Sequence, residues 1–141
     1  MISDQQVGPW VGRTAQRKVQ VTGDMIDEFA RLSGDFSPIH VQEAAARERG
    51  FGSRVAHGML LGSLVSSVIG MDLPGPDGVI QEVQLAFRKT CHPGDEITID
   101  VRVADYFESV QTLLMKVKIT RADGTVLATG KVQSGLRVRH D

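Results

Sequence analysis

Several features that mark other classes of protein are scarce or missing in this chain. Its 141 residues include a single cysteine, Cys91, so no disulfide can form within the chain, and this suits a reducing compartment. No apolar run approaches the roughly eighteen residues of a transmembrane helix, and Met1 to Trp10 lacks the apolar core of a secretory signal. The net charge of −1 provides no field that would attract nucleic acid or an anionic membrane. We therefore expect a cytoplasmic protein that binds neither.

The composition that remains is that of an ordinary globular protein, with 41% hydrophobic and 23% charged residues. No linker, internal repeat or low-complexity tract divides the chain. A chain of this length can bury about two-thirds of its unfolded surface. We therefore expect a single domain over residues 1–141.

The first half of the chain predicts a short edge strand over residues 17–22 and then helices. Thr22 or Asp24 can cap a helix that Gly34 ends, because apolar residues recur between them at helical spacing. An alanine-rich surface helix is expected over Val41 to Arg49, ended by Gly50.

The segment from His57 to Gly70 predicts a helix of another kind. It carries no charged residue and is apolar around most of its circumference, which is typical of a buried helix. Small residues recur at every fourth position and form a shallow groove: Gly58, Gly62, Ser66 and Gly70. Such a groove suits close packing against a sheet, or an extended ligand, and the two are compatible.

The second half predicts strands. Four segments alternate between apolar and polar residues, which indicates an antiparallel sheet with one buried face. Pro93-Gly94 and Asp123-Gly124 suit the turns between them. We expect an α+β fold, a single hot-dog domain in which a five-stranded antiparallel sheet wraps a long buried central helix. The apolar members of the four segments are Val83, Leu85, Phe87; Ile97, Ile99, Val101, Val103; Leu113, Met115, Val117, Ile119; and Val126, Ala128, Val132, Leu136.

The chemistry of the chain concentrates between the first two predicted helices. Asp35 and His40 lie five positions apart, so they cannot share a helix face. Gly34 permits a left-handed turn and Pro38 disfavours helical geometry at Ser37, so a bent loop can aim both side chains at one point. A carboxylate and an imidazole that converge on a water molecule form a hydration or dehydration site, because histidine, with an unperturbed pKa of about 6.5, accepts a proton at neutral pH.

Two blocks of the sequence resemble the MaoC-like dehydratases and (R)-specific enoyl-CoA hydratases, the hydratase-2 family. The first block, from Phe29 to Val41, is similar to the family pattern small-Gly-Asp-x-Asn-Pro-aliphatic-His, with Ser37 where the family usually has Asn. The second block runs from Val55 to Leu61 and contains His57-Gly58. In element order the similarity covers nearly the whole chain, from Thr22 to Leu136.

The resemblance implies a hydro-lyase that reversibly hydrates trans-2-enoyl thioesters to (R)-3-hydroxyacyl thioesters. It assigns catalysis to Asp35 and His40 and the oxyanion contact to the backbone N–H of Gly58, which as an early helix residue has no partner within the helix. It implies substrate-binding or supporting roles for Ser66 and Ser37. We add His57, at the start of the central helix, and Gly62, in the groove of small residues, as further candidates for substrate-binding or supporting roles. The resemblance also implies a homodimer or higher homo-oligomer, an acyl thioester of coenzyme A or acyl carrier protein as ligand, and no cofactor beyond the coenzyme A or phosphopantetheine of the substrate.

Other interpretations of these residues stay open at this point. Asp35 can act only as a cap, and His40 and His57 can be structural histidines. A metal site built from the three is chemically reasonable, but no paired-ligand spacing supports it, so no metal is expected. His92 and His140 are expected to be solvated, and Arg54, Arg88 and Lys89 are candidates for the phosphates of coenzyme A. The competing functions are a hot-dog acyl-thioesterase and a non-catalytic subunit that binds acyl thioesters.

Overall fold

The computed structural model describes residues 9–137, and therefore not His140. Five antiparallel strands form one sheet in the order β1-β3-β4-β5-β2. The strands are β1 (Thr14–Gln20), β2 (Gly78–Phe87), β3 (Glu96–Phe107), β4 (Thr112–Arg121) and β5 (Val126–Leu136). The helices are α1 (Gly23–Ser33), α2 (Pro38–Val41), α3 (Glu43–Glu48) and α4 (Gly58–Met71), and the 3₁₀ turn η2 covers Glu108–Val110.

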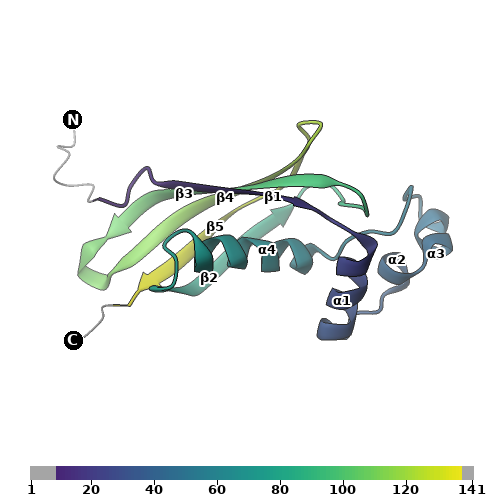
Figure 1. Ribbon diagram of the computed structural model, residues 1–141, viewed down its shortest axis with the longest axis horizontal. Coiled ribbons are helices and arrows are strands. Elements are labelled where there is room, and N and C mark those ends of the chain that lie inside the picture. The colour runs from purple at the N-terminus through teal and green to yellow at the C-terminus, as the bar shows by residue number, and fades with distance from the viewer. Residues whose placement is uncertain (1–8, 138–141) are drawn as a thin grey trace.

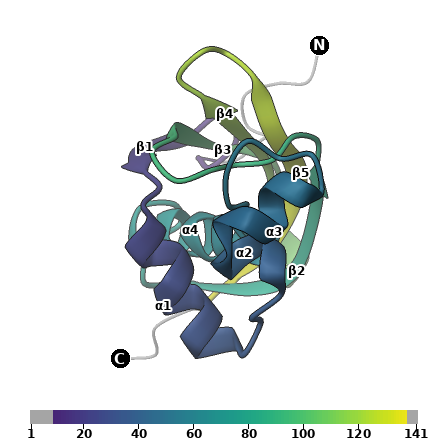
Figure 2. The ribbon, with the colours of Figure 1, turned by 90° about the vertical axis from the view of Figure 1, so that its right-hand side faces the viewer.

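The sheet curls over α4, while α1, α2 and α3 gather at one end of the molecule, beside the first turn of α4 (Figures 1 and 2). This is the predicted hot-dog arrangement. Its core lies between α4 and the inner face of the sheet, because the apolar residues predicted on β3 and β4 are buried there. Those at 0% exposure include Ile97, Ile99, Val101, Val103, Leu113, Met115 and Ile119.

Helix α4 buries one side against the sheet and leaves the other side partly open. Leu61, Val65, Val68 and Ile69 are at most 2% exposed. The stripe of small residues is divided: Ser66 and Gly70 are exposed, whereas Gly58 and Gly62 lie beside Phe87 and Leu85 of β2. The prediction that this helix is buried nearly all round is therefore confirmed only for the side that faces the sheet. Among the described residues, no helix is long and apolar enough to cross a membrane.

Two predicted boundaries were wrong. The first strand begins at Thr14, so it is longer than residues 17–22 and ends before Val21. The helix predicted over Val41 to Arg49 is instead split at Gln42, whose backbone is extended with φ −128° and ψ 115°. Pro38 starts the short α2, because its fixed φ suits the first turn of a helix. His40 therefore stands on one helical turn rather than on an irregular loop.

The edge strand β2 also differs from expectation. The alternation of Val83, Leu85 and Phe87 predicts a buried face, and Val83 and Phe87 do pair in register with buried residues of β5, Val132 and Ala128. Val83 and Phe87 are nonetheless 45% and 47% exposed. Because β2 is the last strand of the sheet, one long edge of its backbone is unpaired within the described chain.

Candidate active site

Asp35 occupies the turn that leaves α1. Gly34 ends that helix with φ 78°, a left-handed conformation that favours glycine. The Oδ1 atom of Asp35 then accepts a hydrogen bond from the backbone N–H of Ser37 at 3.1 Å. This hydrogen bond is the main reason why the pKa of the Asp35 carboxyl is lowered. Asp35 is therefore a carboxylate at neutral pH, and its second oxygen, Oδ2, is the one nearest to His40.

His40 is held with one nitrogen bound and the other free. Its Nδ1 lies 2.6 Å from the carbonyl oxygen of Val55. A carbonyl can only accept, so Nδ1 carries the proton and, in the neutral ring, Nε2 carries the lone pair. The His40 side chain is 12% exposed. This tautomer presents Nε2 as a base.

The Asp35 carboxylate and the His40 ring face one another across a gap. His40 Nε2 lies 3.8 Å from Asp35 Oδ2, which is too long for a direct hydrogen bond. A separation of this size is suited to a single water that donates to both atoms. The structure thus brings together the two residues that the sequence selected for catalysis.

Gly58 is the first residue of α4, directly after His57. Among the described residues its backbone N–H has no acceptor, and the positive end of the helix dipole lies there. A side chain at this position would meet the ring of Phe87, which lies 3.0 Å from where a Cβ would stand. A side chain larger than hydrogen would therefore crowd the Phe87 ring, and the N–H at this helix start is suited to stabilise a developing negative charge.

His57 ties the first turn of α4 to the catalytic residues. It is 2% exposed, its Nε2 donates to the backbone oxygen of Asp35 at 2.9 Å, and its ring stacks on His40 with centroids 3.9 Å apart. Its Nδ1 is buried and unpaired among the described residues. His57 supports both Asp35 and His40 by these contacts.

A metal ion does not suit this cluster, although ligand atoms of Asp35, His40 and His57 all lie within 4.8 Å of one another. Imidazole coordinates through a lone pair in the plane of its ring. The planes of His40 and His57 are stacked and differ by only 22°, so the two lone pairs do not converge on one nearby ion. The absence of a resident metal stays a prediction that this geometry supports.

These residues line a pocket of about 390 Å³. Its wall also includes aromatic and sulfur side chains that sequence analysis did not select, from α1, the start of α4 and the end of β2. Phe29 and Met59 lie within the two motif blocks but carry no acidic, basic or nucleophilic group that would single them out, and Phe87 comes from a distant strand that no local motif connects to the site. The pocket is lined by Phe29, Ser33, Asp35, His40, His57, Gly58, Met59 and Phe87.

Three other predicted residues lie outside this pocket lining. Ser37 contributes its backbone N–H to Asp35, but its side chain does not cap α2. Gly62 and Ser66 lie further along α4, where Gly62 is half-buried beside Leu85 and Ser66 is exposed. Their expected roles in substrate binding stay predictions.

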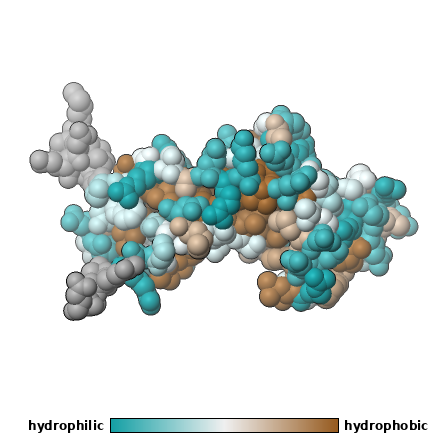
Figure 3. Space-filling view, viewed as in Figure 1, coloured by the Kyte–Doolittle hydropathy of each residue, from teal (hydrophilic) through white to brown (hydrophobic). Residues whose placement is uncertain are grey.

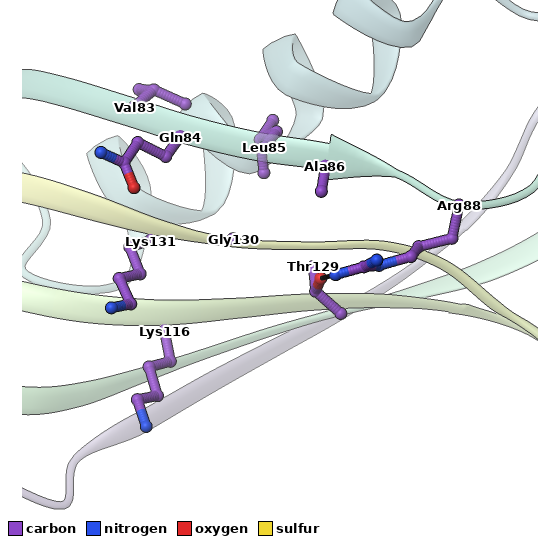
Figure 4. A pocket seen from close by; sticks show the side chains of 9 residues that line it. All are labelled: Val83, Gln84, Leu85, Ala86, Arg88, Lys116, Thr129, Gly130 and Lys131. Atoms are coloured by element: carbon purple, nitrogen blue, oxygen red, sulfur yellow. Dashed lines mark hydrogen bonds between the residues drawn. The ribbon is translucent and has the colours of Figure 1, made fainter.

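A larger hollow, of about 650 Å³, lies on the sheet at strands β2, β4 and β5 and contains none of the predicted catalytic residues (Figure 4). Arg88 reaches back there to hydrogen-bond to Thr129. Lys116 lies directly opposite Arg102 on one side and Lys131 on the other. Like charges that face one another across strands repel. Among the described residues, none of Arg102, Lys116 and Lys131 forms an ion pair.

Two expectations about basic and histidine residues were wrong. His92 is not solvated: its Nδ1 lies 2.9 Å from the backbone oxygen of Arg54, and its Nε2 lies 2.8 Å from Thr90 Oγ1. Arg54 does not point outward to receive a phosphate, because its Nη1 is bound to Asp27 at 2.7 Å. Both residues hold the chain around His40 and His57.

Comparison with known proteins places these features in context. Residues 9–124 match the MaoC-like domain family. The (R)-specific enoyl-CoA hydratase of Aeromonas caviae is 32% identical over 121 residues, which are 86% of this chain and 90% of that protein. The 3-hydroxybutyryl-CoA dehydratase of Methylorubrum extorquens is 38% identical over 95 residues, which are 67% of this chain and 60% of that protein. The chain therefore aligns with less than two-thirds of that dehydratase's length.

The fold has a close counterpart among solved structures. The (R)-hydratase from A. caviae involved in PHA biosynthesis superposes with a TM-score of 0.87 at 31% identity. The superposition covers 92% of this chain and 98% of that one. The sheet and central helix of this chain therefore have the same arrangement as those of a solved (R)-hydratase structure.

Proposed function

Because the chain belongs to the MaoC-like domain family, we propose that it is a hydro-lyase that interconverts trans-2-enoyl and (R)-3-hydroxyacyl thioesters. The names of its relatives, an (R)-specific enoyl-CoA hydratase and a 3-hydroxybutyryl-CoA dehydratase, support the reaction and its stereochemistry. The observation that carries the proposal is the 3.8 Å gap between His40 Nε2 and Asp35 Oδ2. It lies in the same pocket as Gly58.

The proposed mechanism uses these three groups together. A water in the gap donates to Asp35 and His40, and His40 Nε2 takes its proton as the oxygen attacks the β-carbon. The Gly58 N–H stabilises the negative charge that develops on the thioester oxygen. The Asp35–His40 pair then returns a proton to the α-carbon, so that one water is added and no proton is gained or lost overall.

The proposal requires no resident cofactor. Hydration of an activated double bond transfers protons and adds water without an external oxidant or reductant. A carboxylate, an imidazole and a backbone amide supply the acid, base and electrostatic functions that the reaction needs. Coenzyme A or phosphopantetheine enters only as the carrier portion of the substrate.

We also propose that the protein is a homodimer joined along β2. Val79, Val83 and Phe87 are each exposed by about half, at 46%, 45% and 47%. An unpaired edge strand that presents apolar side chains is a template for pairing with another strand. Two copies of β2 would satisfy one another's backbone groups and cover these residues. Phe87 also lines the catalytic pocket, so the dimer contact would lie beside it.

The experiment that tests the function is an assay with crotonyl-CoA. We expect the enoyl absorbance to fall without release of free thiol, and chiral analysis to identify (R)-3-hydroxybutyryl-CoA. Thiol release would instead indicate the acyl-thioesterase. Saturable binding of the thioester with no change in absorbance would indicate the non-catalytic subunit.

A further inference from the structure

We propose that Arg54 is a positioning residue that holds His40 in its reactive orientation, an inference that rests on the proposed function. Arg54 Nη1 donates to two acceptors: the Oδ1 atom of Asp27 at 2.7 Å and the backbone oxygen of His40 at 3.2 Å. The Arg54 side chain is 15% exposed. Gly23 leaves the space that the guanidinium occupies, because a Cβ there would lie 2.7 Å from Arg54 Nη2.

Arg54 and its neighbour Val55 hold the catalytic histidine at both ends. Arg54 donates to the backbone oxygen of His40, while the backbone oxygen of Val55 accepts from the imidazole Nδ1. The backbone N–H of Val55 also donates to Ile39 at 2.9 Å. These hydrogen bonds determine both the position of the backbone and the direction of the ring.

The support is needed because α2 is too short to hold itself. It spans four residues, Pro38–Val41, and a helix of that length has little stability of its own. The His40 carbonyl lies at its C-terminal end, where a cation is favourable. Burial of that carbonyl without a donor would be costly.

Arg54 is itself anchored from two other parts of the fold. Asp27 belongs to α1, so the ion pair connects α2 to that helix. The Arg54 backbone oxygen accepts from His92 Nδ1 at 2.9 Å, and the Ala56 N–H donates to the oxygen of Cys91 at 2.7 Å. Both of these partners lie between β2 and β3, so the sheet, α1 and α2 are connected through one side chain and its adjoining backbone.

The test compares Arg54→Met, which keeps the length of the side chain, with Arg54→Lys, whose ammonium can donate to both oxygens. With crotonyl-CoA we expect Arg54→Met to lower kcat about tenfold or more, with KM changed less than about twofold, because a small misplacement of a catalytic group is costly. Arg54→Lys should recover most of that loss. Arg47→Met, at an exposed position on α3, is the matched control and should leave kcat unchanged.

The decisive comparison repeats Arg54→Met in a His40→Gln background. If Arg54 acts through the imidazole, its removal there should change the residual kcat less than about twofold. A kcat for Arg54→Met equal to that of the wild type, or an equal fall in both backgrounds, would overturn the inference.

If Arg54→Met does not fold, Asp27→Asn replaces it in the same assay. We expect Asp27→Asn to lower kcat by a smaller factor, and an unchanged kcat would overturn the inference. If the wild type itself did not hydrate crotonyl-CoA, or His40→Gln kept full activity, the proposed function would fail as well.

Discussion

His40 and His57 are stacked imidazoles with opposite hydrogen-bonding patterns. His40 donates from Nδ1 to Val55, whereas His57 donates from Nε2 to Asp35. The acceptor is a backbone carbonyl in both cases, so each tautomer is determined by the chain around it. Only the His40 pattern leaves a lone pair directed at the Asp35 carboxylate. At the scale of the residue, local backbone therefore decides which of two neighbouring histidines serves as the base.

Cys91 illustrates the opposite effect, in which surroundings suppress reactivity. Burial, with a smaller contribution from the nearby Asp95 carboxylate, raises the pKa of its thiol to about 12. We predict that iodoacetamide leaves Cys91 unmodified in the native protein at pH 8 to 9 and labels it fully in denaturant, as measured by intact mass. Because the folded pKa is raised above the ordinary value of 9.0, this group's contribution to stability is present below pH 9 and is lost as pH rises from 9 toward 12. Equal labelling rates in the native and denatured protein would contradict the assignment.

At the scale of elements, the spacing of apolar residues predicted whether a segment is a helix or a strand better than it predicted which other elements lie beside that segment. The buried face of α4 and the inner faces of β3 and β4 follow directly from apolar spacing, because that spacing decides which side of an element can face a core. The exposure of β2 could not be predicted in this way. Its alternation marks one apolar face, but nothing local states that β2 is the last strand of the sheet. Similarly, a continuous helical pattern gave no sign of the extended backbone at Gln42.

The site residues also fall into two groups, those that a local motif predicts and those that it does not. Asp35, His40 and Gly58 stand in recognisable local motifs, so sequence selected them and the structure places them in one pocket. Phe87 and Arg54 were not selected for their observed positions, because one is brought to the pocket by the sheet and the other acts through Asp27 on another helix. Residues that depend on contacts between distant segments leave no pattern in a single sequence.

The exposed edge of β2 leads to a prediction about assembly. We expect the wild-type protein to be a dimer in solution, and Val83→Glu to shift it toward a monomer, because a charge would be buried in the contact. Multi-angle light scattering after gel filtration measures the mass directly. Val110→Glu is the control, since Val110 is 66% exposed and belongs to the 3₁₀ turn between β3 and β4 rather than to the edge strand β2. A wild-type monomer, or a dimer unaffected by Val83→Glu, would contradict assembly through this edge.

At the scale of the whole molecule, two parts of the fold supply different groups of the site. The sheet and α4 form a rigid core that places the amide of Gly58 at one end, and α1 with α2 projects beside that end and carries Asp35 and His40 (Figures 1 and 2). Hydrophobic surface also reaches solvent at the lower end of α1 (Figure 3), where Leu32 is 84% exposed. The pocket lies where these parts meet, which suits a ligand with an apolar chain and one polar, reactive end.

The central claim is that Asp35 and His40 act on the same water, and the kcat of Asp35→Asn, His40→Gln and the double variant toward crotonyl-CoA tests it most directly. Each single substitution should lower kcat at least about a hundredfold while circular dichroism shows an intact fold. The double variant should lose little more than either single one, because groups that serve one step together are not additive. Turnover like that of the wild type in either single variant, or losses that multiply in the double variant, would contradict the account.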